Sequence, residues 1–355
     1  MNSMNKKNST IYEIAKLANV SVATVNRAFR ADASIKPQTR ELILKLAEEH
    51  QYKPSIAAAR LSKRTIRIGI LMADFVHVFS EELKAGFIAA YDELRAYKVE
   101  YDIMRFDAQK CSQDDYLRLL EECVEKEYDG ILLVPFSFTP PILEAFNKMH
   151  NSGTELAVVT QEIPSFPALF SATYHILEAG RMAAEMLHLC VKGPDVVVFT
   201  GHMENNIHKT LVRGFQTEAR EYDLNIMQII NTKEDPEYAR LQAISMLKAD
   251  KLPDGIYISS ANSVSIIEEV LRRNLEGRIS IVASDTFPEM IRYIEQGVVS
   301  ATIFQNPYKQ AKMAFENMFY HIAEGRAVPK VLMVTPQIVI KSNVNLFKDQ
   351  EKMSV

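Results

Sequence analysis

A short segment near the start of the chain carries polar side chains at a spacing suited to contact with DNA bases. Residues 21–29 have the apolar spacing of a helix, with Val25 and Ala28 on one side. Asn26 and Arg27 then fall on the opposite side, facing solvent. An exposed arginine on such a helix is able to pair with guanine O6 and N7 in the major groove. The segment therefore predicts a DNA-reading helix; the alternative is a small helical bundle with an ordinary charged surface.

Two polar side chains follow predicted apolar strands in the second half of the chain. Asp285 comes after strand 279–284, and Gln305 ends strand 300–305. The carboxyl ends of parallel strands border the crevice where ligands bind, so a carboxylate there is able to accept hydrogen bonds from vicinal hydroxyls. The Gln305 amide both donates and accepts, as a sugar hydroxyl requires. These residues predict a small polar ligand; the alternative for Asp285 is capping of the helix that follows.

Motifs of the common catalytic and metal sites are missing from the sequence. There is no phosphate-binding Gly-x-Gly-x-x-Gly or Walker motif, no Gly-x-Ser-x-Gly elbow, and no His/Cys cluster at metal spacing. The 8 histidines are scattered, as are Cys111, Cys123 and Cys190. We therefore expect no enzymatic activity, no cofactor and no metal. Free thiols fit a reducing compartment, although burial as small apolar side chains is the simpler role for the cysteines.

The first 65 residues predict a compact three-helix unit followed by a linker. Thr10 and Ser21 are the expected N-caps of the first two helices, with a turn at Asn19-Val20 between them. Pro37 suits the first turn of a third helix that runs to residue 50. We therefore expect a disordered tail at 1–9, a helix-turn-helix domain at 10–53 and a hinge helix or linker at 54–65. The hinge is short and alanine-rich, so it predicts a marginal helix that orders only when something packs on it.

From Ile66 the pattern changes to alternating strands and amphipathic helices. Strands are predicted at 66–73, 99–106, 129–134, 155–160, 195–200, 225–230, 255–259, 279–284 and 300–305. Helices are predicted between and after them, at 80–97, 113–126, 140–151, 176–191, 208–221, 236–249, 263–274, 287–295 and 307–323. Many of the strands are runs of Ile, Leu and Val, as expected for parallel strands that are covered on both faces.

This alternation predicts an α/β body of two doubly wound parallel-sheet lobes, because it is too long for one sheet. We place the first lobe at 66–163 and 304–332, the second at 164–303 and 333–347, and a short polar tail at 348–355. The expected crossover between the lobes is the irregular segment from Pro164 to Pro167. The competing architecture is a TIM barrel, which such an irregular connection fits less well.

Charge is unevenly divided along the chain. The net charge is −4, yet residues 1–65 hold 12 basic and 5 acidic residues. A basic head on an acidic body is typical of a separate nucleic-acid-binding module, since neutralisation of phosphates supplies much of such affinity. The N-terminus lacks the apolar core of a signal peptide, and no apolar run approaches the roughly 20 residues of a membrane span. We therefore expect a cytoplasmic protein with no membrane partner.

Taken together, these features resemble the lac repressor–galactose repressor (LacI-type) family over nearly the whole chain. In the head, the similar segments are Thr10 to Ala15, Ala18 to Ser21, Thr24-Val25 with Arg27, Lys36 to Arg40, Tyr52 to Pro54, and Ala57 to Leu61 with Lys63. The body is similar to the ribose-binding type of periplasmic-binding fold at Ile68 to Leu71, Ala179 to Arg181, Arg213 to Phe215, Ser284-Asp285 and Ala301 to Pro307. The resemblance implies a transcriptional repressor that binds a near-palindromic double-stranded DNA operator as a homodimer. It also implies a small effector, a carbohydrate in type, held between the lobes.

The resemblance assigns roles in DNA binding to individual residues. Base contacts fall to Val22, Ala23, Asn26 and Arg27. Because valine and alanine only pack, for example on thymine methyl groups, Arg27 is expected to carry most of the polar recognition. Phosphate contacts fall to Thr10, Tyr12, Ser21, Thr24 and Thr39, whose hydroxyls are equally suited to caps and surface positions. Ala58 and Leu61 match the minor-groove hinge, where an apolar wedge bends the duplex; the alternative for Leu61 is a core position at a domain boundary.

The resemblance also implies a set of ligand-binding residues. The matching positions are His77, Phe79, Ser80, Ser137, His208, Asn262, Asp285 and Gln305. Phe79 is equally suited to the core, and Asn262 to a helix cap. Several charges common in the family are missing, since Leu211 stands in place of an arginine and Ser137 in place of an acidic residue. The ligand is therefore expected to be a modified, larger or less polar sugar, or a different kind of molecule.

Two other functional classes stay open at this point. One is a solute-binding protein, cytoplasmic or exported, that has no operator-specific DNA binding. The other is an α/β enzyme with a helical appendage. The basic head and the missing export signal favour the regulator over both.

Overall fold

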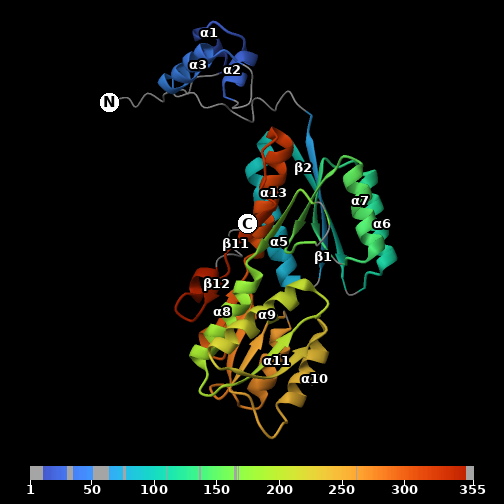
Figure 1. The fold of residues 1–355 in the computed structure, drawn as a ribbon, viewed down its shortest axis with the longest axis vertical. Coiled ribbons are helices and arrows are strands. Elements are labelled where there is room, and N and C mark those ends of the chain that lie inside the picture. The colour runs from blue at the N-terminus through green and yellow to red at the C-terminus, as the bar shows by residue number, and fades with distance from the viewer. Residues whose placement is uncertain are drawn as a thin grey trace. The chain divides into compact units, whose positions relative to one another are not determined.

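The computed structural model describes residues 11–29, 35–50, 64–74, 77–108, 110–135, 137–163, 166, 168–260 and 262–348. Within these ranges, the side chains of six residues lie outside the description: Ile11, Tyr12, Val22, Ala23, Asn26 and His77. The chain divides into two compact units, a head within residues 1–64 and a body that begins at Thr65 (Figure 1).

The head consists of three helices, α1 (Ile11–Leu17), α2 (Val22–Ala28) and α3 (Pro37–Glu49), as expected. Ser21 is the N-cap of α2, where its hydroxyl accepts a hydrogen bond from the Thr24 amide at 3.2 Å. The core joins all three helices through Ile14, Ala15, Ala18, Val25, Ala28, Ile43 and Ala47. Leu42 of α3 is 47% exposed and does not belong to this core. The predicted N-cap Thr10 and the predicted hinge at 54–63 lie outside the described residues.

The first lobe of the body is a six-stranded parallel sheet of order β11-β5-β4-β3-β1-β2. Its strands are β1 (Ile66–Asp74), β2 (Val99–Asp107), β3 (Gly130–Val134), β4 (Glu155–Val159), β5 (Phe170–Tyr174) and β11 (Val331–Val334). Its helices are α5 (His77–Leu94), α6 (Gln113–Glu125), α7 (Pro140–Asn151) and α13 (Pro307–Glu324), with a short 3-10 helix η1 (Arg95–Tyr97). The helices α6 and α7 cover one face of the sheet, and α5 and α13 cover the other (Figure 1).

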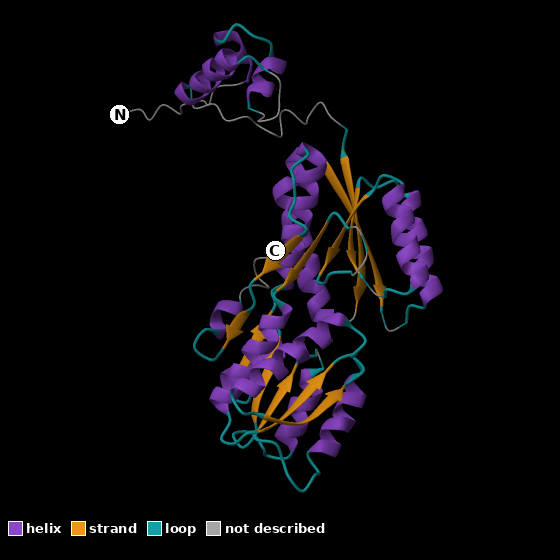
Figure 2. Ribbon diagram, viewed as in Figure 1, coloured by secondary structure: helices purple, strands orange, loops and turns teal. Residues whose placement is uncertain are grey.

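The second lobe is another six-stranded sheet, of order β12-β10-β9-β8-β6-β7 (Figure 2). Its strands are β6 (Asp195–Thr200), β7 (Asn225–Asn231), β8 (Gly255–Ile258), β9 (Ser280–Ser284), β10 (Ala301–Phe304) and β12 (Gln337–Val339). Only β12 runs antiparallel, against β10. One face packs on α8 (Ile176–Cys190) and α9 (Asn206–Glu221). The other face packs on α10 (Pro236–Met246), α11 (Ser263–Arg272) and α12 (Pro288–Gln296), near the 3-10 helix η2 (Val344–Phe347).

The two-lobe architecture is confirmed, and the TIM barrel alternative is wrong. Every predicted strand and helix of the body appears, with ends within a few residues. The strands β5, β11 and β12 were not predicted from the sequence. Of these, β5 reads Phe-Ser-Ala-Thr-Tyr and has no run of Ile, Leu or Val, although all five of its residues are buried. Its strand character comes from pairing with β4 and β11 on either side.

The expected lobe boundary at residues 164–167 is wrong. Because β5 belongs to the first sheet, the chain leaves that lobe only after Tyr174. It returns between β10 and α13 at Gln305-Asn306, and passes to the second sheet again between β11 and β12. The first lobe thus contains residues 66–174 and 307–334. The second contains residues 176–304 and continues from residue 337.

Two glycines allow α8 and α9 to pack backbone against backbone. A Cβ atom added to Gly180 would lie 2.1 Å from the carbonyl oxygen of Leu211, and one added to Gly214 would lie 2.1 Å from that of Leu177. Arg181 also reaches across to Glu218, with Nε 2.6 Å from Oε2. The two glycine-containing segments that resemble the family therefore form one helix–helix contact, which fixes α9 beside the sheet.

We expect the substitution Gly214→Ala to destabilise the body by about 1–3 kcal/mol, because its Cβ displaces a backbone carbonyl in a packed contact. Helix propensity alone predicts the opposite sign, a gain of roughly 1 kcal/mol for glycine to alanine. Urea unfolding followed by circular dichroism measures the difference. Arg213→Ala, at an exposed position of the same helix, is the matched control and should be nearly neutral. A stabilised Gly214→Ala protein would contradict the proposed close contact.

Candidate functional site

The second helix of the head carries the predicted DNA-reading residues. Val25 and Ala28 are buried in the head core, and Arg27 is exposed on the other side of α2. The side chains of Val22, Ala23 and Asn26 lie outside the description, so their predicted base contacts stay predictions. The same holds for Thr10, Tyr12, Ala58 and Leu61. The structure thus orients α2 with Arg27 available to a partner.

The predicted phosphate-contact residues that can be placed lie near the start of α2 and α3. The hydroxyl of Ser21 lies 2.9 Å from that of Thr24 and also caps the helix. Thr24 and Thr39 are half-buried, and Ser21 is exposed. Ser21 therefore has a structural role as the cap of α2. Its predicted phosphate contact stays a prediction.

The carboxyl ends of the strands in the two lobes border a shared cavity of about 160 Å³. From the first lobe it is lined by Phe79, Val134, Thr160, Gln161 and Tyr174, at or beyond the ends of β3, β4 and β5 and on α5. From the second lobe it is lined by Ala179, His202, Asn205, Ile207, His208, Leu211, Glu234, Ser259, Ser284, Asp285, Ile303 and Gln305. A second cavity of similar volume adjoins it and shares Phe79, Ser284 and Asp285. This is the position expected of a ligand site in parallel α/β sheets.

Asp285 has an unusual backbone conformation and accepts a hydrogen bond from Gln305. Its φ angle is 67°, in the left-handed region that non-glycine residues rarely adopt. The Gln305 side-chain amide donates to Oδ2 of Asp285 at 2.7 Å, and the Asp285 amide donates to the Ile303 carbonyl at 2.9 Å. The N-cap of α12 is Phe287, and it has no side-chain cap hydrogen bond. The alternative in which Asp285 caps the next helix is therefore wrong, and the carboxylate is available to the cavity.

The electrostatic state of Asp285 follows from its enclosure. Burial raises its pKa from 3.8 to about 6, and the hydrogen bonds from Gln305 partly oppose this rise. Burial likewise raises the pKa of the neighbouring Tyr174, with a further contribution from the Asp285 charge. Above pH 6 the chain therefore holds an ionised carboxylate in a poorly solvated position. Hydroxyl or amine donors from a ligand would stabilise that ionised form.

The structure brings together four of the predicted ligand residues, Phe79, His208, Asp285 and Gln305. Ser80, Ser137 and Asn262 do not line either cavity. Ser80 and Asn262 are buried, and the Asn262 amide lies 3.5 Å from the Thr232 hydroxyl. The His77 side chain lies outside the description.

Several lining residues were missed by the reasoning from sequence. Tyr174 and Thr160 lie at the carboxyl ends of β5 and β4, so recognition of β5 as a strand would have pointed to Tyr174. Glu234 lies in the loop before α10, where no periodic pattern marks it. Among the described residues no group of three or more His, Cys, Asp or Glu side chains is placed to hold a metal ion. None of the helices that the structure describes combines the length and hydrophobicity that a membrane crossing requires.

Two protein-family models match the chain. The model described as bacterial regulatory proteins, lacI family, matches residues 10–55, and the periplasmic binding protein domain model matches residues 68–327. The first match spans the helices of the head, and the second spans most of both lobes.

Similar proteins include regulators that match most of the chain. The chain is 25% identical over 345 residues to the HTH-type transcriptional repressor PurR of Vibrio parahaemolyticus, covering 95% of this chain and 98% of that protein. It is 27% identical over 264 residues to catabolite control protein A of Priestia megaterium, covering 71% of this chain and 74% of that protein. The crystal structure of GanP, a glucose-galactose binding protein from Geobacillus stearothermophilus, matches with a TM-score of 0.71 at 22% identity. That match covers 79% of this chain and 99% of GanP, and shows the fold of the body alone.

We expect Asp285→Asn to stabilise the ligand-free body at pH 7.5 relative to the natural chain. The folded-state pKa of Asp285 lies above its unfolded value, so the ionised carboxylate costs stability as the pH rises through 6. The stability difference between the variant and the natural chain should grow by about 2 kcal/mol from pH 4.5 to pH 7.5. Urea unfolding at both pH values measures it.

Asp195→Asn provides a control of opposite sign. Hydrogen bonds from Lys251 and Asn225 lower the pKa of Asp195 below 3.8. That ionised carboxylate therefore stabilises the fold at neutral pH, and its replacement should cost stability at pH 7.5 but not in strong acid. An Asp285→Asn variant that follows the same trend as the control would contradict the poorly solvated carboxylate.

Proposed function

The chain belongs to the lacI family of bacterial regulatory proteins, with a periplasmic-binding-protein domain as its body, and we propose that it represses transcription under the control of a sugar-like effector. The observation that carries the proposal is the presence of both parts in one chain. A helix-turn-helix head with an exposed arginine precedes a two-lobed body whose cleft is lined by the buried carboxylate of Asp285. A solute-binding protein without a DNA-binding head does not explain residues 10–55. The similar proteins named as repressors support regulation rather than catalysis.

In the proposed mechanism, each head reads one half of a near-palindromic operator. Arg27 pairs with a guanine in the major groove, Val22 and Ala23 pack on neighbouring bases, and Asn26 contacts a base or a phosphate. Thr10, Tyr12, Ser21, Thr24 and Thr39 contact phosphates and fix the position of the head without reading sequence. Ala58 and Leu61 insert into the minor groove and bend the duplex.

The effector acts through the segments that cross between the lobes. Gln305 both binds Asp285 and begins the crossing that leads into α13 of the first lobe. A ligand that donates to Asp285 competes with Gln305 for the same carboxylate, so binding alters the contacts at this crossing. The effector changes operator affinity only to the extent that it prefers one lobe arrangement over the other. GanP, similar in fold, is described as a glucose-galactose binding protein, which supports a carbohydrate as the effector.

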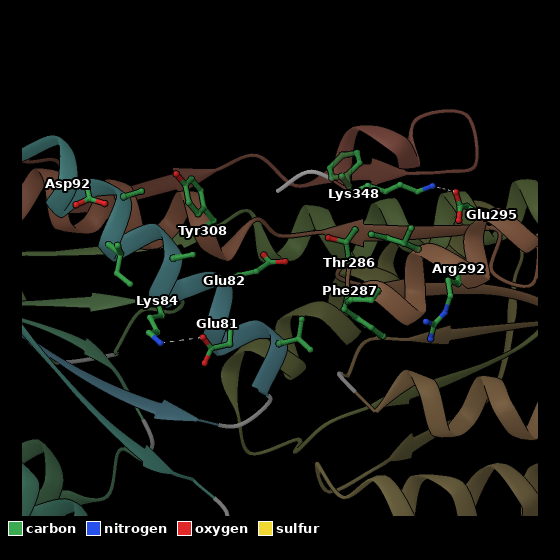
Figure 3. Close-up of a pocket in the computed structure, with 17 residues that line it drawn as sticks. Glu81, Glu82, Lys84, Asp92, Thr286, Phe287, Arg292, Glu295, Tyr308 and Lys348 are labelled. Carbon is green, nitrogen blue, oxygen red and sulfur yellow. Dashed lines mark hydrogen bonds and ion pairs between the residues drawn. The ribbon is translucent and has the colours of Figure 1, made fainter. Parts of the chain in front are cut away.

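A groove on the body supports a homodimer. It has a volume of about 650 Å³ and runs between α5 of the first lobe and α12 of the second (Figure 3). Apolar side chains of Ile88, Ala89 and Ile291 line it. Both sides carry charges of both signs: Glu81 pairs with Lys84 on α5, and Glu295 of α12 pairs with Lys348. A second copy of the chain would cover both lobes through this groove and present two heads to the two operator halves. We propose that this homodimer forms in the cytoplasm.

Selection from a random pool of duplex DNA by the full-length protein tests operator binding. We expect enrichment of a near-palindromic sequence, and we expect Arg27→Ala to lose about 1–3 kcal/mol of discrimination at one base pair in each half-site. Competition gel shifts with single-base operator variants measure the discrimination. Lys45→Ala, at an exposed position of α3 outside the predicted base contacts, is the control and should leave the discrimination between sequences unchanged. Unchanged selectivity of Arg27→Ala would remove Arg27 from base recognition, and a pool without enrichment would refute operator binding.

The variant Ala89→Arg tests the homodimer. Placing a charge in the centre of the groove should raise the dimer dissociation constant at least tenfold, since an unpaired charge is costly to bury. Sedimentation velocity at several protein concentrations measures it. Val124→Arg, on α6 and already 41% exposed, is the control and should leave the dimer intact. A monomeric natural chain, or an unaffected Ala89→Arg dimer, would contradict an interface at this groove.

A further inference from the structure

A histidine and a glutamate form a pair in the wall of the cleft. His208, on α9, and Glu234, in the loop before α10, have Nε2 and Oε1 2.8 Å apart. Their side chains are 14% and 18% exposed, and both residues line the same cavity as Asp285 and Gln305. The Nδ1 atom of His208 has no hydrogen-bond partner within the part of the chain that the structure describes. The pair therefore adds a second polar group to the cleft, and Nδ1 of His208 is able to form a hydrogen bond with a ligand.

The backbone around the pair is arranged to hold it. Lys233 and Glu234 both have φ angles in the left-handed region, at 55° and 52°. A Cβ atom added to Gly201 would lie 1.7 Å from Oε1 of Glu234 and 2.4 Å from Nε2 of His208. The pair thus occupies the space that any other residue at position 201 would fill. Two successive residues in the left-handed region indicate a specific role for this pair, because such strain persists only where the surroundings enforce it, and the missing side chain at position 201 leaves room for both groups.

The cleft holds negative charge without a fixed positive one. Among the described residues that line its two cavities there is no lysine or arginine, whereas Glu82, Glu234, Asp285 and Glu289 are present. Lys233, next to Glu234 in the chain, is not among the lining residues, and its ammonium lies over the ring of Tyr238, 4.4 Å from the centroid. Apolar lining is supplied by Phe79, Ile207, Leu211 and Ile303, among others. An anionic ligand would therefore meet several carboxylates, with no lysine or arginine among the described lining residues to pair with it.

We propose that the effector is an uncharged sugar anchored by two carboxylates, Asp285 and Glu234, and that the cleft rejects the phosphate esters of the same sugars. Hydroxyls of the ligand donate to the carboxylates of Asp285 and Glu234 and bond to Nδ1 of His208, and apolar side chains of the cleft pack on the carbon skeleton. This inference rests on the proposed function, since it names the effector class of that regulator. It makes Glu234 a specificity-determining residue that combines ligand binding with exclusion of anions.

Binding measurements with matched sugars test the charge selectivity. The full-length protein is titrated with uncharged pentoses, hexoses and disaccharides, and with the phosphate ester of each, including D-ribose with ribose 5-phosphate and D-glucose with glucose 6-phosphate. Melting temperature and calorimetry at pH 7.5 are the readouts, since a specific ligand stabilises the fold by mass action. We expect one or more uncharged sugars to bind and each corresponding ester to bind at least 100-fold more weakly. Tighter binding of an ester, equal binding of both members, or silence across the set would overturn the proposal.

Variants of the pair test its role with the uncharged sugar that binds. Glu234→Gln keeps the shape of the side chain and removes its charge, and should weaken binding about tenfold or more. Gly201→Ala displaces the pair while leaving the chemical groups of Glu234 and His208 unchanged, and should weaken binding to a similar degree while the fold persists by circular dichroism. Glu237→Gln, on the exposed surface of α10 and paired with Arg240, is the matched control and should bind as the natural chain does. Binding by Glu234→Gln and Gly201→Ala at natural affinity would remove Glu234 from the site.

The outcome is separable from that of the proposed function. Operator selection by the ligand-free protein does not depend on the identity of the effector. If the protein enriches a near-palindromic duplex but binds phosphate esters, the regulator stands and the assignment of an uncharged sugar fails. If it binds uncharged sugars but enriches no duplex, the sugar specificity stands and the assignment as a repressor fails.

Discussion

The hydrogen bond between the Gln305 amide and the Asp285 carboxylate is the contact on which the cleft depends. It joins the end of β9 to the segment that carries the chain from the second lobe back to the first. Asp285 adopts a strained backbone conformation and is poorly solvated. The hydrogen bond from Gln305 therefore stabilises the ionised carboxylate, and this stabilisation is lost if Gln305 moves away. In the proposed mechanism, a ligand that supplies other donors to Asp285 competes with Gln305 at the start of this crossing. Ligand recognition and lobe geometry are in this way linked through a single pair of side chains.

A second constraint is the close approach of helix backbones in each lobe. Gly180 and Gly214 allow α8 and α9 to touch, and Gly86 allows α5 to approach the Tyr308 carbonyl at the start of α13. The first contact sets the position of α9, which carries His208 into the cleft. The second joins the two helices that follow β1 and the return crossing. The glycines thus act on the site from a distance, because they determine where helices that begin at the cleft are placed.

The sequence predicted those parts of the fold that depend on local periodicity. The alternation of strand and helix patterns, with many runs of Ile, Leu and Val, predicted nine strands, and the cap at Ser21 predicted the start of α2. It failed where neighbours decide the conformation, as in β5, whose mixed residues become a strand by pairing on both sides. In the cleft, Asp285 and Gln305 were predictable because they end apolar strands. Glu234 was not, since its place depends on a strained loop and on the space left by Gly201.

The arrangement of the cleft gives up stability in the ligand-free state. An ionised Asp285 is poorly solvated, Glu234 is held in strained backbone, and His208 has a nitrogen without a partner among the described residues. A ligand whose hydroxyls form hydrogen bonds with these groups would offset this cost when it binds. Its binding free energy would then include relief of the unfavourable state as well as the new contacts. An anion would recover none of it, because it adds like charge where two carboxylates already lie. In the proposed mechanism, these unfavourable features would provide both the energy for a conformational response and the basis for selecting the ligand.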